Sequence, residues 1–119
     1  MLKWILLLML PLSATAATLS WEAPTTREDG SSMTPAEIAE YRVYYAIDTI
    51  PTLQSTEVIV TEGLTKEVEL NLLSGTYVVN FGIVTVDTDG LSSQMSEIVS
   101  KSYVITSPPG PPTNLTIKE

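Results

Sequence analysis

The 119-residue chain contains no cysteine and no histidine, and the two absences restrict what it can do. Without cysteine the fold has no disulfide framework, and no lipid can be attached through an N-terminal cysteine. Without histidine the chain lacks the usual general base, the commonest nitrogen ligand of zinc and the side chain most often used to sense mild acid. We therefore expect a protein that is not an enzyme and that needs no cofactor.

Basic residues are also scarce. Six lysine and arginine residues stand against fourteen aspartate and glutamate residues, which gives a net charge of −8. An acidic chain of this kind repels the phosphate backbone of nucleic acids and the surface of anionic membranes. Nucleic acid is therefore not an expected partner.

The longest apolar run lies at the N-terminus and is too short to cross a membrane. One positive charge at Lys3 is followed by a run of about ten apolar residues ending at Leu12, whereas a span needs roughly 20. Small residues follow at 13–16, where signal peptidase requires them. This pattern predicts a signal peptide over 1–16, cleavage after Ala16 and a secreted, extracellular or periplasmic protein. The remaining 103 residues, with five basic and fourteen acidic side chains, carry a net charge of −9 and have the size of one small β-sandwich.

Beyond the leader, alternation of apolar and polar residues recurs in short runs separated by turn residues. No long stretch has helical periodicity, so the pattern predicts an all-β protein. One helical turn is expected over Pro35–Ala39, because Thr34, Pro35 and Glu37 form a capping-box pattern. The predicted strands are Thr18–Ala23, Tyr41–Ile47, Thr56–Thr61, Glu67–Leu72, Thr76–Val86 and Ile98–Ile105.

Two strands show which face is expected to point inward. In the longest run one face carries two aromatic residues, and this face is predicted to be the core side; the other face is apolar enough to need cover from a loop or a neighbour. Tyr44 and Tyr45 point to opposite faces, so one of them is expected to be exposed. The core-side residues of the longest run are Tyr77, Val79, Phe81 and Ile83.

Four motifs in order resemble a fibronectin type III domain of the form common in bacterial and phage proteins. They are Leu19-Ser-Trp21-Glu-Ala-Pro24, Tyr41-Arg-Val-Tyr-Tyr45, Leu73-Ser-Gly-Thr-Tyr77 and Val86-Asp-Thr-Asp-Gly-Leu-Ser-Ser93. The resemblance covers 17–105 and implies an immunoglobulin-like β-sandwich of about seven strands, used as a scaffold for adhesion, spacing or protein and glycan binding. It supplies no catalytic residues. The domain is expected to span 17–106, followed by a Pro-rich linker and a strand-like tail over 107–119.

The chain departs from the family at two places. The position of the family's corner tyrosine falls on Val79, with Tyr77 two residues earlier, so either a bulge shifts the register or the tyrosine hydrogen bond is rearranged. The family's Pro-rich entry and first edge strand, moreover, stand at the wrong end of the chain, over Pro108–Ile117. The first strand is thus displaced to the C-terminus, and an edge of the sandwich is left bare.

The displaced segment leads to a hypothesis about assembly. Asn114, Leu115 and Ile117 belong to a segment that would add as a strand to the edge beside Thr18–Trp21 of a neighbouring copy, head to tail. In the alternative, the tail is disordered or adds to its own other sheet and is a relic of a longer tandem protein. The sequence leaves both open.

Acidic turn residues provide a weak candidate for a calcium site. Asp87 and Asp89 stand in an Asp-Thr-Asp-Gly turn, and the family topology places Glu28, Asp29 and Glu62 at the same pole. Solvated acids that shape turns are the alternative explanation. No metal is expected beyond this weak candidate.

Two classes of function remain. In the first the chain is a secreted binding or adhesion module that contacts an unknown protein or glycan through its loops, although those loops hold almost no aromatic residues. In the second it is a structural subunit or spacer of an extracellular assembly that uses strand exchange. An accessory phage virion protein is a weaker third reading, against which the leader argues.

Overall fold

The computed structural model describes residues 13–61 and 63–118, and this part of the chain is nearly all β. Each of the six runs predicted to form a strand does so, with ends that differ by a few residues. A short 3-10 turn over Pro35–Glu37 precedes the second strand. The strands are β1 (Ser13–Ser20), β2 (Ile38–Ile47), β3 (Thr56–Val60), β4 (Thr65–Leu72), β5 (Gly75–Asp87) and β6 (Val99–Ile105).

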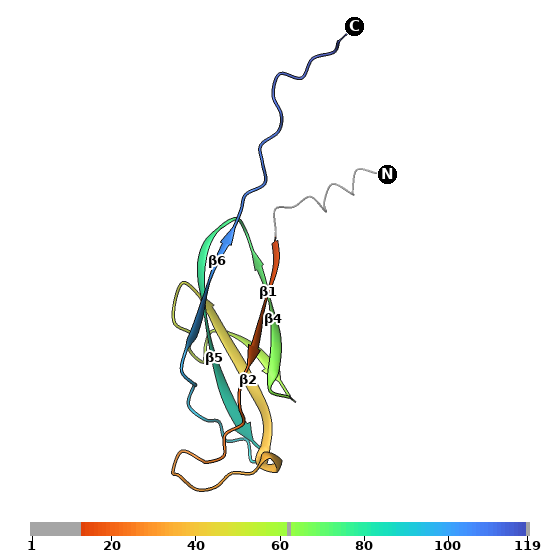
Figure 1. The fold of residues 1–119 in the computed structure, drawn as a ribbon. Coiled ribbons are helices and arrows are strands. Elements are labelled where there is room, and N and C mark those ends of the chain that lie inside the picture. Colours follow the sequence, from red (N-terminus) through yellow and green to blue (C-terminus); the bar gives the residue numbers. More distant parts are fainter. Residues whose placement is uncertain (1–12, 62, 119) are drawn as a thin grey trace.

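The strands form two antiparallel sheets that face each other, the arrangement of a β-sandwich (Figure 1). One sheet has the order β3-β2-β5-β6, and the other contains only β1 and β4. In the larger sheet the central pair is β2 and β5, with Val43 opposite Ile83. The small sheet places Leu19 opposite Lys66, and no strand within 13–61 or 63–118 lies on the other side of β1.

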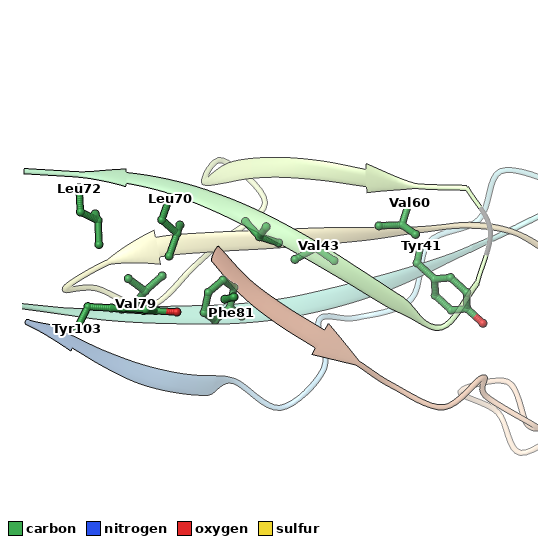
Figure 2. Packing of buried hydrophobic residues seen from close by; sticks show 10 residues of the cluster. Tyr41, Val43, Val60, Leu70, Leu72, Val79, Phe81 and Tyr103 are labelled. Carbon is green, nitrogen blue, oxygen red and sulfur yellow. The ribbon is translucent and has the colours of Figure 1, made fainter. Parts of the chain in front are cut away.

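The core lies between the two sheets and follows the period-two pattern of the strands. Figure 2 shows Leu70 and Leu72 of β4 pointing toward Val79, Phe81 and Tyr103 of the opposite sheet. The face predicted to point inward on β5 is therefore the core face. Burial of these aliphatic and aromatic side chains is the main source of stability in a chain without disulfides.

The outer face of β5 is covered as well. Val84 and Val86 form a second buried cluster with Tyr44 of β2, and Met95 packs against it from the segment that leads to β6. Gly82 makes this possible, because a Cβ there would lie only 2.5 Å from the Met95 sulfur. The cover predicted for this face is thus supplied by the chain itself.

The expectation of one exposed tyrosine in β2 is wrong. Tyr45 faces the main core and is half-buried, while Tyr44, on the outer face, is only 4% exposed. The Tyr44 hydroxyl donates a hydrogen bond of 2.6 Å to a Glu57 carboxylate oxygen. Alternation assigned the two side chains to opposite faces correctly, but the cover predicted for the outer face of β5 was not extended to Tyr44 on the neighbouring strand.

Two local expectations are refined. The turn after Thr34 has three residues instead of the expected five, because the pairing of β2 begins at Ile38. Glu37 accepts hydrogen bonds from the backbone N–H and the hydroxyl of Thr34, as a capping residue does.

At the start of β5 the register with β6 is regular, and the Tyr77 hydroxyl donates a hydrogen bond to the Ser74 carbonyl at 3.4 Å. No bulge therefore shifts the register there, and the hydrogen bond of Tyr77 is made within the turn that precedes β5.

Both ends of the sandwich differ from the predicted boundaries. β1 begins at Ser13, inside the segment predicted to be a leader, and it ends before Trp21. The tail predicted as a seventh strand forms none: residues 106–118 leave β6 as an extended segment that projects away from the sandwich (Figure 1). The reason is geometric, since the tail leaves at the opposite end from the place where a strand antiparallel to β1 would have to begin.

We expect Leu70→Ala to lower the free energy of unfolding by about 2 to 5 kcal/mol, because it leaves a cavity in a buried site of the core. The matched control is Leu73→Ala, three residues along and exposed, which is expected to change stability by less than about 0.5 kcal/mol. Urea unfolding followed by fluorescence measures both. Equal effects of the two variants would contradict the packing described here.

Candidate functional site

The connections before β2, before β4 and after β5 lie at one end of the sandwich, as the family topology predicted for their acidic residues. β1 ends, β2 begins, β4 begins and β5 ends at the same end of the sandwich, because Ser20 lies opposite Thr65 and Ile38 lies opposite Asp87. We call this end the loop pole; it comprises residues 21–37, 63–64 and 88–98. The long connection before β2 is joined to the loop after β5 by a hydrogen bond of 2.8 Å from the Gln94 backbone N–H to Glu28.

Arg27 holds the loop pole together. Its guanidinium forms ion pairs with Asp87 at 2.8 Å and with Glu37 at 3.0 Å, so it joins the end of β5 to the turn before β2. The hydrogen bond from Arg27 is the largest cause that keeps the pKa of Asp87 below its ordinary value. The pKa of Glu37 is also lowered, first by the Thr34 backbone N–H and then by Arg27.

The acidic residues proposed for calcium are mostly occupied by the protein itself. Asp87 is 3% exposed, and besides Arg27 it accepts hydrogen bonds from the backbone N–H groups of Asp89 and Leu91. Asp29 accepts from the backbone and hydroxyl of Ser31. Glu62 lies outside the described residues. Within the described ranges no three acidic side chains are grouped so that they would hold a metal ion. The turn acids thus act as hydrogen-bond acceptors that shape loops.

An open pocket of about 740 Å³ lies at the loop pole. Its apolar wall includes Trp21 and Tyr41, whose rings meet edge to face at 5.4 Å, and its rim carries Arg27 and Glu28. Leu91, largely exposed, stands at its mouth. Its lining combines these aromatic rings with charged and hydroxyl side chains.

A second hollow, a groove of about 320 Å³, runs beside the free edge of β1. Leu19 and Trp21 form one side of the groove, the core residue Phe81 lies in its wall, and Val99 lies on the side of β6. Val99 sits opposite Phe81 in the strand register and yet is 55% exposed. Leu19 and Val99 thus face the interior and are still partly exposed to solvent. We call this uncovered strip between β1 and β6 the seam; it lacks a covering strand in the described part of the chain.

A buried polar atom accompanies this seam. The indole Nε1 of Trp21 is buried and has no hydrogen-bond partner in the described part of the chain. A buried donor without an acceptor costs about 1 to 3 kcal/mol relative to one that is paired. The same side chain lines both the groove and the loop-pole pocket.

The tail residues singled out in the sequence lie far from the groove in the single chain. Leu115 is 93% exposed and Ile117 is 87% exposed, and Asn114 adopts a positive φ of 57°. All three belong to a segment without strand pairing. The structure therefore does not bring the tail to the edge of β1 within one copy.

The tail leaves from the end opposite to the loop pole. Ser13 at the start of β1 pairs with Leu72, and Gly75, just after the following turn, pairs with Ile105 at the end of β6. The start of β1 and the end of β6 consequently share one end, as Figure 1 shows, and we call it the tail pole.

Sequence reasoning missed two residues of these sites. Arg27 was not recognised as an organiser, although it is a lone basic residue in a long acidic connection and that isolation was an available signal. Val99 was placed only within a predicted strand, and no local pattern reveals that the space above it is open. That space depends on which strands the chain can place around it.

Comparison of the chain with protein-family models, with curated proteins and with solved structures finds no match. Among the described residues, no helix is long and apolar enough to cross a membrane.

Protonation of Asp87 is expected to weaken the fold in acid. Because its folded pKa lies below the ordinary value of 3.8, its contribution is present above that value and is lost as the pH falls through the folded pKa. Asp87→Asn should therefore lower the urea midpoint at pH 7 and flatten the loss of stability below about pH 4. Glu67→Gln, which alters an exposed carboxylate of β4, is the control. The same acid sensitivity in Asp87→Asn and the parent chain would contradict the role given to Asp87.

Proposed function

We propose that the chain is a non-catalytic, exported module of fibronectin type III kind that serves as a structural subunit of an extracellular assembly. The leader 1–16 directs export and is removed after Ala16. Copies join head to tail when segment 114–118 of one copy adds as a strand to the free edge of β1 in the next. The observation that carries the proposal is the apolar groove beside that edge in a chain whose own apolar tail is left uncovered.

The alternation of the tail suits such an edge. Leu115 and Ile117 are two residues apart and would point to one face of an added strand, while Asn114, Thr116 and Lys118 would point to the other. An added strand forms backbone hydrogen bonds with the edge and buries alternate side chains. Two aliphatic side chains facing Leu19 and Val99 would remove from water the apolar surface that the seam leaves exposed.

Chain direction favours a neighbour over the same copy. A strand antiparallel to β1 must begin at the loop pole, whereas the tail starts from the tail pole. The linker of the tail, 106–112, reaches about 22 Å at ~3.1 Å per residue in polyproline form, while the eight residues of β4, which span the small sheet, extend about 27 Å. A tail that simply turned back would run parallel to β1, and parallel pairs are somewhat less stable. The loop pole of a copy stacked above the tail pole is directly accessible.

The test uses the processed chain, 17–119, in size-exclusion chromatography with light scattering. We expect a mass that rises above the monomer with concentration, because each copy carries both a donor and an acceptor. Leu115→Asp with Ile117→Asp should return it to a monomer. Asn114→Asp with Thr116→Asp adds the same charge on the other face and should leave association within a few-fold of the parent. A parent chain that stays monomeric at millimolar concentration contradicts the proposal.

Mixing two complementary variants tests the direction of assembly. Val99→Asp is expected to block the acceptor groove, and deletion of 107–119 removes the donor. Each variant alone should be monomeric, and the mixture should form only 1:1 dimers, because one free donor then meets one free acceptor. Mixtures that stay monomeric would show that tail and groove do not recognise each other.

The pocket at the loop pole favours a second candidate, binding of a protein or glycan partner by the loops. This candidate predicts that Leu91→Asp, at the mouth of the pocket, abolishes adhesion to cell or glycan surfaces. Leu53→Asp, on an exposed loop between β2 and β3, is the matched control and should have no effect. Equal adhesion by both variants and the parent would contradict binding at this pole.

A further inference from the structure

The bond predicted for cleavage lies in the middle of a strand. In β1, Ala16 lies opposite Glu69 and Ala17 lies opposite Val68, so the bond between Ala16 and Ala17 belongs to the ladder with β4. Ala17 is 7% exposed and is part of the main core cluster. The four residues before the bond and the four after it are all in β1.

This placement protects the bond. A peptidase binds its substrate as an extended segment on both sides of the bond, and it needs the backbone groups that β1 shares with β4. Releasing the segment would separate the only two strands of the smaller sheet and expose Ala17 and Leu19 to water. The folded chain can offer the bond only through such an opening, which is rare where core residues are involved.

We propose that the fold decides whether the chain is processed: signal peptidase cleaves the Ala16–Ala17 bond before β1 pairs with β4, and a chain that folds first keeps its leader. Hydrolysis adds water across the bond and leaves a carboxylate on Ala16 and an ammonium group on Ala17. This inference rests on the export step of the proposed function. It implies that the chain crosses the membrane unfolded.

Cleavage also changes the sheet that remains. The processed chain keeps only Ala17–Ser20 of β1, opposite 65–68 of β4. Residues 69–72 of β4 lose their partner strand while Leu70 and Leu72 still point into the core. The unprocessed fold therefore has a longer β1 and a better covered β4 than the mature one, and should unfold at a higher temperature.

The experiment compares two preparations of the full chain, 1–119, with purified signal peptidase in detergent micelles. One is diluted from urea directly into the enzyme, and the other is refolded first and checked by circular dichroism. Mass spectrometry of the new N-terminus gives the cleavage rate. We expect the cleavage rate of the refolded chain at this bond to be at most about one tenth of the rate of the chain diluted from urea.

Two variants with an unchanged cleavage segment control for substrate recognition. Val68→Asp, in the buried position opposite Ala17, should restore rapid cleavage of the refolded chain, and Glu67→Gln, exposed on the same strand, should not. Equal rates for refolded and unfolded parent chains overturn the inference. Failure of the unfolded chain to be cleaved after Ala16 instead contradicts the export step of the proposed function.

Hydrogen exchange provides a second readout. The amides of 69–72 should exchange faster in 17–119 than in the refolded full chain, because the partner strand has been removed. Exchange of 76–81 in β5, which pairs with β2 and β6, serves as the internal reference. Identical protection of 69–72 in the two forms would contradict the pairing on which the inference depends.

Discussion

The pairing of β1 with β4 is the interaction on which the rest of the structure depends. Among the residues that the structure describes, these two strands form the whole of one sheet, and each is the other's only partner. A two-stranded sheet is at best marginally stable by itself, so this one persists because it covers the interior face of the larger sheet. The free edge of β1, the groove beside it and the protection of the processing bond all follow from this minimal sheet.

In the proposed function the small sheet connects export with assembly. A sandwich with one edge uncovered can accept another strand, and the same chain carries an apolar, exposed segment at its C-terminal end. Proteins usually shield such edges with charge or bulges, whereas here the inward-facing Leu19 and Val99 remain partly accessible. In the proposed function this uncovered edge is the place where the next copy adds its strand.

The loop pole is acidic, and two of its carboxylates are joined by one arginine. Asp87 and Glu37 converge on Arg27, and their charges shape the loops. The topology implied by the family resemblance placed the loops at one end, as the structure does, and the acidic turns were noted from the sequence. Sequence reasoning did not identify their common partner, since the ion pair joins residues sixty positions apart.

The sequence by itself determined the all-β class, the six strands and the inward face of β5, because period-two alternation is local and each strand repeats it. It also singled out Leu115 and Ile117 in a displaced strand-like tail, but it left open whether the same copy covers that tail; the structure leaves both side chains exposed. Only the tertiary structure decided that Tyr44 is buried, that Val99 borders an open groove and that the Ala16–Ala17 bond sits in a ladder. Those properties depend on which segments meet across the sandwich, and local patterns carry no information about segments that are distant in the chain.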